Sequence, residues 1–220
     1  MKITLSIIGI CVLVFLLQVI LKDPFNNTFS LIPSAALSGQ VWQFVTYMFL
    51  HGDPMHLFLN MVALFIFGFT IEKTLGRKKY LTLFFVSGIL SAVLYLVLTL
   101  AITPVQDLPI VMNTRLIGVS GAAFAIMAAY GLLYPRNWII MFPGIPMPAI
   151  VAVIVFAGIE IFYGLTGLEA GVANWGHVGG LLVGVLMVTY WKKRSQRRPK
   201  IVFDDLKENP RGKDWEYIWE

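Results

Sequence analysis

The sequence predicts an all-α, polytopic membrane protein in which six transmembrane helices form one bundle. Of the 220 residues, 58% are hydrophobic and only 13% are charged, and the mean hydropathy is +0.77. A soluble domain of this length carries more charge, because its surface must be hydrated. The basic residues gather near the ends of the apolar runs. Membrane orientation therefore explains the net charge of +5 better than nucleic-acid binding does, and we expect no nucleic-acid partner.

Six apolar runs define the expected membrane-spanning helices, because about 20 apolar residues cross the hydrocarbon core of a bilayer. They cover residues 3–21, 55–71, 80–102, 119–134, 147–166 and 174–191, and the fourth run is short. No clear small-residue cleavage site follows the first run, so we expect a retained span and not a signal peptide. The expected domains are a six-helix membrane domain at 1–192 and a short cytoplasmic tail at 193–220.

The basic residues also predict the orientation of the bundle. The connections on one side of the membrane carry only Lys22 and Arg115. The other side is rich in basic residues, namely Lys73, Arg77, Lys78, Lys79, Arg136, Lys192, Lys193, Arg194, Arg197, Arg198 and Lys200. By the positive-inside rule, both termini lie in the cytoplasm of a cell membrane and the connections 22–54, 103–118 and 167–173 lie outside. The basic start of the tail is expected to contact anionic membrane lipids.

Three groups of polar residues interrupt the expected spans, where hydrogen-bonding and ionisable side chains are costly and mark function. His56 and Asn60 begin the second span shortly after His51, Ser120 begins the fourth span, and His177 begins the sixth. These three spans run inward from the outer side, so the polar side chains share one depth in the membrane. His56 and Asn60 are also four residues apart and therefore lie on one helical face.

Each of these residues has a simpler explanation when it is taken alone. A lone serine usually bonds to a carbonyl of the preceding turn, and a lone histidine can hold helices together. Gly180 and Gly184 form a Gly-xxx-Gly pair, which is most often a packing device. A metal site at His51, His56 and His177 would lack an intramembrane carboxylate or thiolate at that depth, so we expect no metal or cofactor. The shared depth of the polar groups weakens the simpler explanations.

Together the three groups supply the parts of a serine hydrolase. A serine hydroxyl becomes a nucleophile when a base accepts its proton, and His177 can serve Ser120 if the fourth and sixth helices pack closely. Small residues permit that packing, namely Gly121, Ala125 and Ala128 on one helix and Gly180 and Gly184 on the other. The Ser120 N–H, at a helix start, has no partner within its helix. It can form an oxyanion hole with the side chains of His56 and Asn60.

Three motifs occur in order along the chain. His51-x4-His56-x3-Asn60 leads into the second span, Gly118-Val119-Ser120-Gly121 opens the fourth, and His177-x2-Gly180-x3-Gly184 lies on the sixth. Together they resemble the motifs of the rhomboid family of intramembrane serine proteases, and the likeness extends to Trp42, Gly68, Glu72 and Gly76. Each motif alone is weak, but all three on a six-span layout are highly specific, and they imply a rhomboid-like bundle.

The resemblance implies a serine endopeptidase with a Ser–His dyad, no catalytic aspartate and the transmembrane segments of other membrane proteins as substrates. The implied site has Ser120 and His177 as catalytic residues, His56, Asn60 and the Ser120 N–H as the oxyanion hole, and Gly118, Gly121, Phe124, Gly180 and Gly184 as supporting residues. Without an aspartate, His177 needs another partner to orient it. Phe124 lies one turn after Ser120, where many relatives are expected to carry tyrosine, and can stack on the imidazole.

The resemblance also bears on the loops and on the fifth span. Gln43 follows Trp42 where family members often have arginine, so a loop-anchoring ion pair is not expected. The fifth span, preceded by prolines, is similar to the family's mobile gating helix, and the connection 167–173 is expected to cover the site as a lid. The substrate segment should unwind easily near the outer surface, because a helical backbone hides its carbonyls. A small residue before the cut is expected, because the site is crowded and lined with glycines.

Three other functions were weighed against proteolysis. A catalytically inactive rhomboid-like protein would bind membrane clients without cutting them, but Ser120 and His177 are both present. A small transporter would place a binding residue near mid-membrane, whereas polar residues here concentrate toward one face. A proton pathway through His56 and Glu160 would need a relay across the whole membrane, and the inner halves of the spans are apolar.

Overall fold

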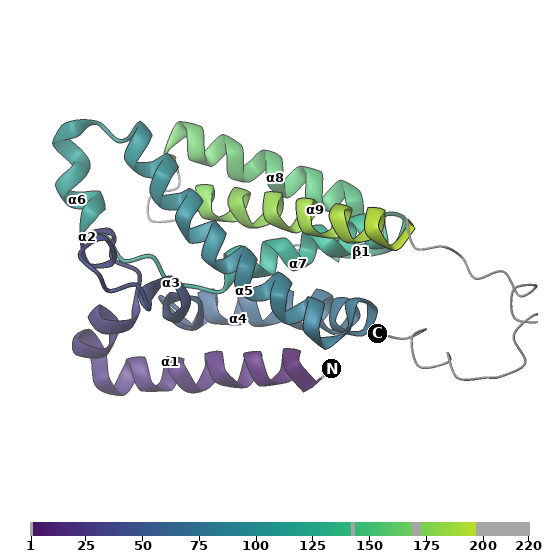
Figure 1. Cartoon of the computed structure of the whole chain (residues 1–220), viewed down its shortest axis with the longest axis horizontal. Coiled ribbons are helices and arrows are strands. Elements are labelled where there is room, and N and C mark those ends of the chain that lie inside the picture. The colour runs from purple at the N-terminus through teal and green to yellow at the C-terminus, as the bar shows by residue number, and fades with distance from the viewer. Residues whose placement is uncertain (1, 142–143, 169–172, 197–220) are drawn as a thin grey trace, which may run out of the picture. The chain divides into compact units, whose positions relative to one another are not determined.

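The computed structural model describes residues 2–141, 144–168 and 173–196 of the chain. Most of the described residues are helical, and the predicted all-α class is confirmed (Figure 1). A compact unit covers Met1–Val188, and a second unit covers Thr189–Glu220. Most of the expected tail, from residue 197 onward, lies outside the described residues, and its start at 193 stays a prediction.

The elements follow one another along the chain with short connections. The helices are α1 (Lys2–Phe29), α2 (Pro33–Leu37), α3 (Gln43–Thr46), η1 (Tyr47–Phe49), α4 (Pro54–Ala63), η2 (Leu64–Gly68), α5 (Phe69–Ile102), η3 (Val105–Asp107), α6 (Leu108–Met112), α7 (Ser120–Leu133), α8 (Ala149–Thr166) and α9 (Asn174–Gln196). The strands are β1 (Trp138–Met141) and β2 (Ile145–Pro148).

The long apolar helices agree with the predicted spans. Among the described residues, the segments Lys2–Phe29, Pro54–Ile102 and Ala149–Thr166 are long and apolar enough to cross a membrane, and α7 is a shorter apolar helix. The backbone of α1 leaves the helical region at Lys22 (φ 54°, ψ −138°), one residue after the predicted end of the first span. Pro24 follows this break, and its ring and missing N–H disfavour an uninterrupted helix there.

The segment Pro54–Ile102 contains the second and third predicted spans, which reverse direction at Gly76. The backbone of Gly76 has φ 75° and ψ 165°, a conformation that side chains rarely permit. A Cβ atom on Gly68 would lie 2.8 Å from the Tyr80 hydroxyl, so the two arms of the turn touch. The carboxylate of Glu72 accepts hydrogen bonds from the backbone N–H groups of Ile3 (3.1 Å) and Thr4 (2.9 Å). Glu72 thereby attaches the start of α1 to this turn.

Helix α7 lies in the interior of the bundle, beside α5 and α8 (Figure 1). Small side chains dominate it, and Ala122, Ala125, Ala128 and Ala129 are buried. These small residues let α9 approach backbone to backbone. A Cβ atom on Gly184 would meet the Ala125 carbonyl oxygen at 2.5 Å, and one on Gly180 would overlap the Gly121 carbonyl. The predicted close packing of the fourth and sixth spans is therefore confirmed.

A β-hairpin between α7 and α8 was not predicted from the sequence. Strands β1 and β2 pair antiparallel, with Ile139 opposite Met147 and Ile140 opposite Pro146. Proline has no N–H to donate to a neighbouring strand, and each strand is only four residues long. Neither the hydrophobic periodicity nor the composition of this segment therefore predicted a strand. The hairpin ends directly at Ala149, the first residue of α8, and the backbone N–H of Ala149 donates to the Asn137 carbonyl (2.8 Å).

Gln43 anchors the connection between α1 and α4 without an ion pair. Its side chain is buried, and its carbonyl oxygen accepts from the Ile32 N–H at 3.0 Å. Its amide group donates to the Gln40 side chain at 3.0 Å, and the adjacent Trp42 indole donates to the Thr28 carbonyl at 2.9 Å. The absence of arginine at position 43 is thus offset by neutral hydrogen bonds.

Candidate active site

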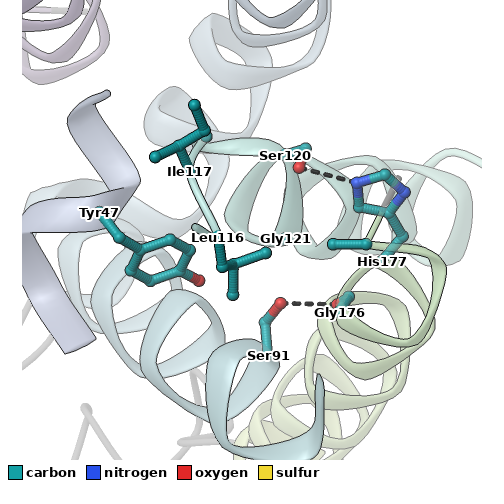
Figure 2. Close-up of a pocket in the computed structure, with 10 residues that line it drawn as sticks. Tyr47, Ser91, Leu116, Ile117, Ser120, Gly121, Gly176 and His177 are labelled. Carbon is teal, nitrogen blue, oxygen red and sulfur yellow. Dashed lines mark hydrogen bonds between the residues drawn. The ribbon is translucent and has the colours of Figure 1, made fainter. Parts of the chain in front are cut away.

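The side chains of Ser120 and His177 form the centre of the site. Ser120 is the first residue of α7 and His177 lies in the first turn of α9. The His177 Nε2 atom is 2.8 Å from the Ser120 Oγ atom, within hydrogen-bond distance (Figure 2). Because Ser120 begins its helix, its backbone N–H has no acceptor within α7 and is available to a ligand. The arrangement can activate a hydroxyl and stabilise an adjacent negative charge.

The ring of Phe124 lies against the ring of His177. The rings of Phe124 and His177 are stacked, with centroids 4.5 Å apart and planes tilted by 13°. Phe156 of α8 lies edge-on against Phe124, with centroids 6.1 Å apart and an interplanar angle of 86°. Two aromatic rings from two helices therefore restrict the tilt of the imidazole.

Glu160 of α8 lies on the other side of the imidazole. Its Oε2 atom is 2.9 Å from His177 Nδ1, and the two side chains are 10% and 13% exposed. The Asn174 amide donates to the same oxygen at 2.9 Å. The distance is that of an ion pair, but Nδ1 has no hydrogen bond of good angle to any described residue. The carboxylate is therefore the group placed to satisfy that nitrogen after a small reorientation of the ring.

The expectation that no intramembrane carboxylate joins the histidines at this depth is wrong. The sequence suggested Glu160 only as part of a proton pathway. The position of Glu160 in the sequence could have indicated its depth in the membrane. Helices α8 and α9 are consecutive, and Glu160 lies six residues before Thr166, the end of α8. His177 lies three residues after Asn174, the start of α9, so the two side chains fall at similar depth. Counting from the connecting loop would have paired them.

His56 faces the loop that precedes Ser120. The backbone N–H of Gly52 donates to His56 Nδ1 at 3.3 Å, so a neutral His56 carries its proton on Nε2. A Cβ atom on Gly118 would lie 2.9 Å from that Nε2, and Gly118 has φ +120°. Glycine at position 118 thus permits both the backbone conformation and the approach of the imidazole. The His56 Nε2–H group is a donor directed toward the residues next to Ser120.

Asn60 lies one turn further along α4 and is buried. Its amide donates to the His56 carbonyl at 3.0 Å, a bond within its own helix. An amide nitrogen has two hydrogens, so one donor remains for another acceptor. The described bonds of Asn60 do not include the dyad, and its place in the oxyanion hole stays a prediction.

The loop before Ser120 is attached to the neighbouring elements at three points. Leu116 exchanges two backbone hydrogen bonds with Leu31, at 2.8 and 3.0 Å. The Gly118 N–H donates to the Tyr47 carbonyl at 3.0 Å. The Arg115 guanidinium contacts Asp23 at 2.9 Å, beyond the break in α1. These attachments fix the position from which α7 starts, and hence that of the Ser120 hydroxyl.

A small pocket lies beside the dyad, and two of its polar residues were missed from the sequence. Tyr47, Ser91, Leu116, Gly118, Gly121 and Gly176 are among its lining residues, together with Ser120 and His177 (Figure 2). The Ser91 hydroxyl donates to the Gly176 carbonyl at 2.6 Å, next to His177. The Tyr47 hydroxyl donates to the Gly88 carbonyl at 2.7 Å. Both residues carry no motif, so only the tertiary fold identifies them.

Other predicted features lie beyond the dyad or outside the described residues. The His51 and His56 rings are 5.2 Å apart, and no group of three His, Cys, Asp or Glu residues suited to a metal occurs in the described part of the chain. Gly167 ends α8 with φ 65°, but residues 169–172 of the expected lid and Pro143 fall outside the described ranges.

Comparison with known proteins places this site in a family. The family model for the Rhomboid domain matches residues 38–194. The chain is 28% identical over 207 residues to the Rhomboid protease GlpG of Yersinia pestis (strain Pestoides F), an alignment that covers 89% of this chain and 64% of that protein. It is 28% identical over 205 residues to the Rhomboid protease AarA of Providencia stuartii, covering 84% of this chain and 70% of that protein. The chain belongs to the rhomboid family.

Proposed function

We propose that the protein is an intramembrane serine endopeptidase that hydrolyses peptide bonds in the transmembrane segments of other membrane proteins. The observation that carries the proposal is the 2.8 Å contact between Ser120 Oγ and His177 Nε2 at the start of a helix inside an apolar bundle. The names of the relatives, both rhomboid proteases, support the same activity.

The first chemical step in this mechanism is the attack of Ser120 on a substrate carbonyl. His177 Nε2 accepts the hydroxyl proton as Oγ forms a bond to the carbonyl carbon, which gives a tetrahedral oxyanion. The imidazolium then donates that proton to the leaving amine as the peptide bond breaks. Water, deprotonated by the same nitrogen, hydrolyses the remaining ester and regenerates the serine. One base therefore serves both halves of the reaction.

The oxyanion is stabilised by donors that converge near Ser120. Its own backbone N–H points away from α7 at the positive end of the helix dipole. The His56 Nε2–H group approaches Gly118, two residues before the nucleophile. The free hydrogen of the Asn60 amide is the third donor. Such donors act mainly on the transition state, because the negative charge is absent from the bound substrate.

The substrate in this proposal is a helix that unwinds where it meets the site. A helical segment bonds its own carbonyls, so cleavage requires local unfolding. The pocket beside the dyad is lined by glycines and by Ser91, which favours a small residue before the cut. We place the site toward the extracytoplasmic face of the cell membrane, with both termini in the cytoplasm, from the distribution of basic residues.

A fluorophosphonate probe tests the proposal directly, because such probes label only activated serine nucleophiles. The parent protein in detergent should be labelled and should cut a model transmembrane substrate. Ser120→Ala and His177→Ala should do neither while keeping the thermal stability of the parent. An unlabelled, inactive parent, or a Ser120→Ala variant that still cuts, would refute the protease function.

A further inference from the structure

We propose that Glu160 is a positioning residue that completes a Ser120–His177–Glu160 triad. The ability of His177 to act as a base then depends on how α8 packs against α9. This inference rests on the proposed function and extends it, since the sequence motifs imply a dyad alone. The two ring nitrogens of His177 face two different partners. Nε2 lies 2.8 Å from Ser120 Oγ, and Nδ1 lies 2.9 Å from Glu160 Oε2.

The carboxylate selects the tautomer that the base needs. Nε2 can accept the serine proton only if the neutral ring carries its hydrogen on Nδ1. An ionised carboxylate only accepts, so a nearby carboxylate favours the Nδ1–H form. The same carboxylate stabilises the imidazolium that forms during attack, without taking the proton itself. Glu160 is placed to do both, because no other described group satisfies Nδ1.

The location of Glu160 is costly for a residue that only joins helices. An ionisable side chain in the membrane needs partners, and a buried ion pair is often no more stabilising than apolar packing of the same volume. Glu160 is 8% exposed and has two partners, His177 and Asn174. Asn174 is the first residue of α9, so the carboxylate also lies near the positive end of that helix. Both partners of the carboxylate thus lie on α9, the helix that carries His177.

Helix α8 contacts the site through one stripe of residues spaced four apart. Phe156 supports the ring of Phe124, Glu160 contacts His177, and Gly164 packs on Trp175 of α9, whose ring would meet an added Cβ atom at 3.0 Å. Residues spaced by four lie on one helical face, so they move together. A displacement of α8 from α9 therefore removes the carboxylate from His177 and the Phe156 ring from Phe124 at once.

Another buried carboxylate provides a matched control. Glu72 is 2% exposed and binds the backbone N–H groups of Ile3 and Thr4 and the Thr4 hydroxyl, which are contacts that join helix termini. Glu72→Gln should lower the melting temperature and leave kcat unchanged. Glu160→Gln makes the same replacement of a carboxylate by an amide as Glu72→Gln, but next to His177.

The decisive experiment compares kcat, KM and the rate of fluorophosphonate labelling for the parent, Glu160→Gln and Glu72→Gln. We expect Glu160→Gln to lower kcat and the labelling rate on the order of 10-fold or more, with KM within about twofold, because a wrong tautomer affects the chemical step. Parent values of kcat and labelling in Glu160→Gln would overturn the triad. An unlabelled parent would instead refute the proposed function.

A spectroscopic measurement tests the tautomer in the parent protein and depends neither on activity nor on a variant at Glu160. The protein has three histidines, so ¹⁵N resonances can be assigned to His177 by comparison with His177→Ala. The parent should show a protonated Nδ1 and an unprotonated Nε2 at neutral pH. A parent with the hydrogen on Nε2 would overturn the triad even if the enzyme is active.

Discussion

The ring of His177 lies flat on the ring of Phe124, with centroids 4.5 Å apart. Phe124 lies on the helix that begins at Ser120, four residues after it. Stacking is a property of the ring, so the phenyl group supports the imidazole without a tyrosine hydroxyl. The same residue spacing that presents Ser120 thus also restrains its base.

Replacing Phe124 tests whether this stacking matters for turnover. Phe124→Leu should lower kcat by roughly tenfold, because an aromatic contact contributes about 0.5–1.5 kcal/mol and about 1.4 kcal/mol corresponds to a tenfold change in rate. Phe124→Tyr keeps the ring and should stay within about twofold of the parent. Cleavage of a transmembrane substrate measures both, and equal rates for the leucine variant and the parent would contradict the argument.

Asn60→Ala should lower kcat by about 10²-fold with little change in KM, because an oxyanion donor acts mainly on the transition state. Asn113→Ala is a matched control. The Asn113 amide also donates to a carbonyl four residues earlier, that of Pro109 at 2.8 Å, but it lies in an exposed loop. Steady-state kinetics on both variants decide the question, and an unchanged kcat in Asn60→Ala removes this amide from the mechanism.

Gly180→Ala should destabilise the bundle by about 1–3 kcal/mol, the usual cost of overpacking a close-packed interior. The added methyl group would overlap the Gly121 carbonyl and separate α7 from α9. Gly158→Ala on α8 is the control, because a Cβ atom there meets nothing within 4 Å. Thermal unfolding in detergent should show a lower melting temperature for the first variant only. Equal melting temperatures for Gly180→Ala and the parent would mean that α7 and α9 can move apart without a loss of folding free energy.

Asp53 should make the stability of the protein fall in acid. Its carboxylate accepts from the N–H groups of His56 and Met55, both at 2.8 Å, and caps α4. The hydrogen bond from the His56 N–H is the main cause that holds the pKa of Asp53 below its usual range. A depressed folded-state pKa means that the stabilisation is complete above the unfolded-state pKa, about 3.9, and is lost as pH falls through the folded-state value.

Two variants at this position separate the charge from the cap. Asp53→Asn keeps a side-chain acceptor but does not titrate, so its melting temperature should depend less on pH below about 4. Asp53→Ala removes the cap and should melt lower than the parent at neutral pH. Melting curves between neutral pH and pH 3 test both. A parent and an asparagine variant with parallel pH dependence would exclude a contribution from this carboxylate.

The sequence predicted the apolar spans and the approach of Ser120 to His177 because each depends on a local pattern. Membrane spans follow from apolar runs, and the break at Lys22 falls where the first run ends. The close approach of α7 and α9 follows from small residues, which leave only backbone at the contact, as between Gly184 and Ala125. Ser120 and His177 could be paired because the direction of each span fixes the depth of its first residues.

Features without a motif or a periodic pattern of their own were not predicted. Glu160 has no motif around it, and its meaning comes from His177 on the next helix. Ser91 is one of several serines in apolar helices, and only the fold places it at the Gly176 carbonyl. The β1–β2 hairpin is too short for a periodic signal and contains prolines that argue against a strand.

The backbone contact between α7 and α9 determines how thermal motion acts on the site. Gly180 and Gly184 have no rotamers, and the atoms that they face belong to the main chain of Gly121 and Ala125. No side-chain rotation at these positions can change the distance between the α7 and α9 backbones, which varies as the two helix axes move. On its other face, His177 contacts α8 through the long, rotatable side chain of Glu160. His177 thus has one rigid neighbour and one adjustable neighbour, and a movement of α8 can change the second contact without disturbing the first.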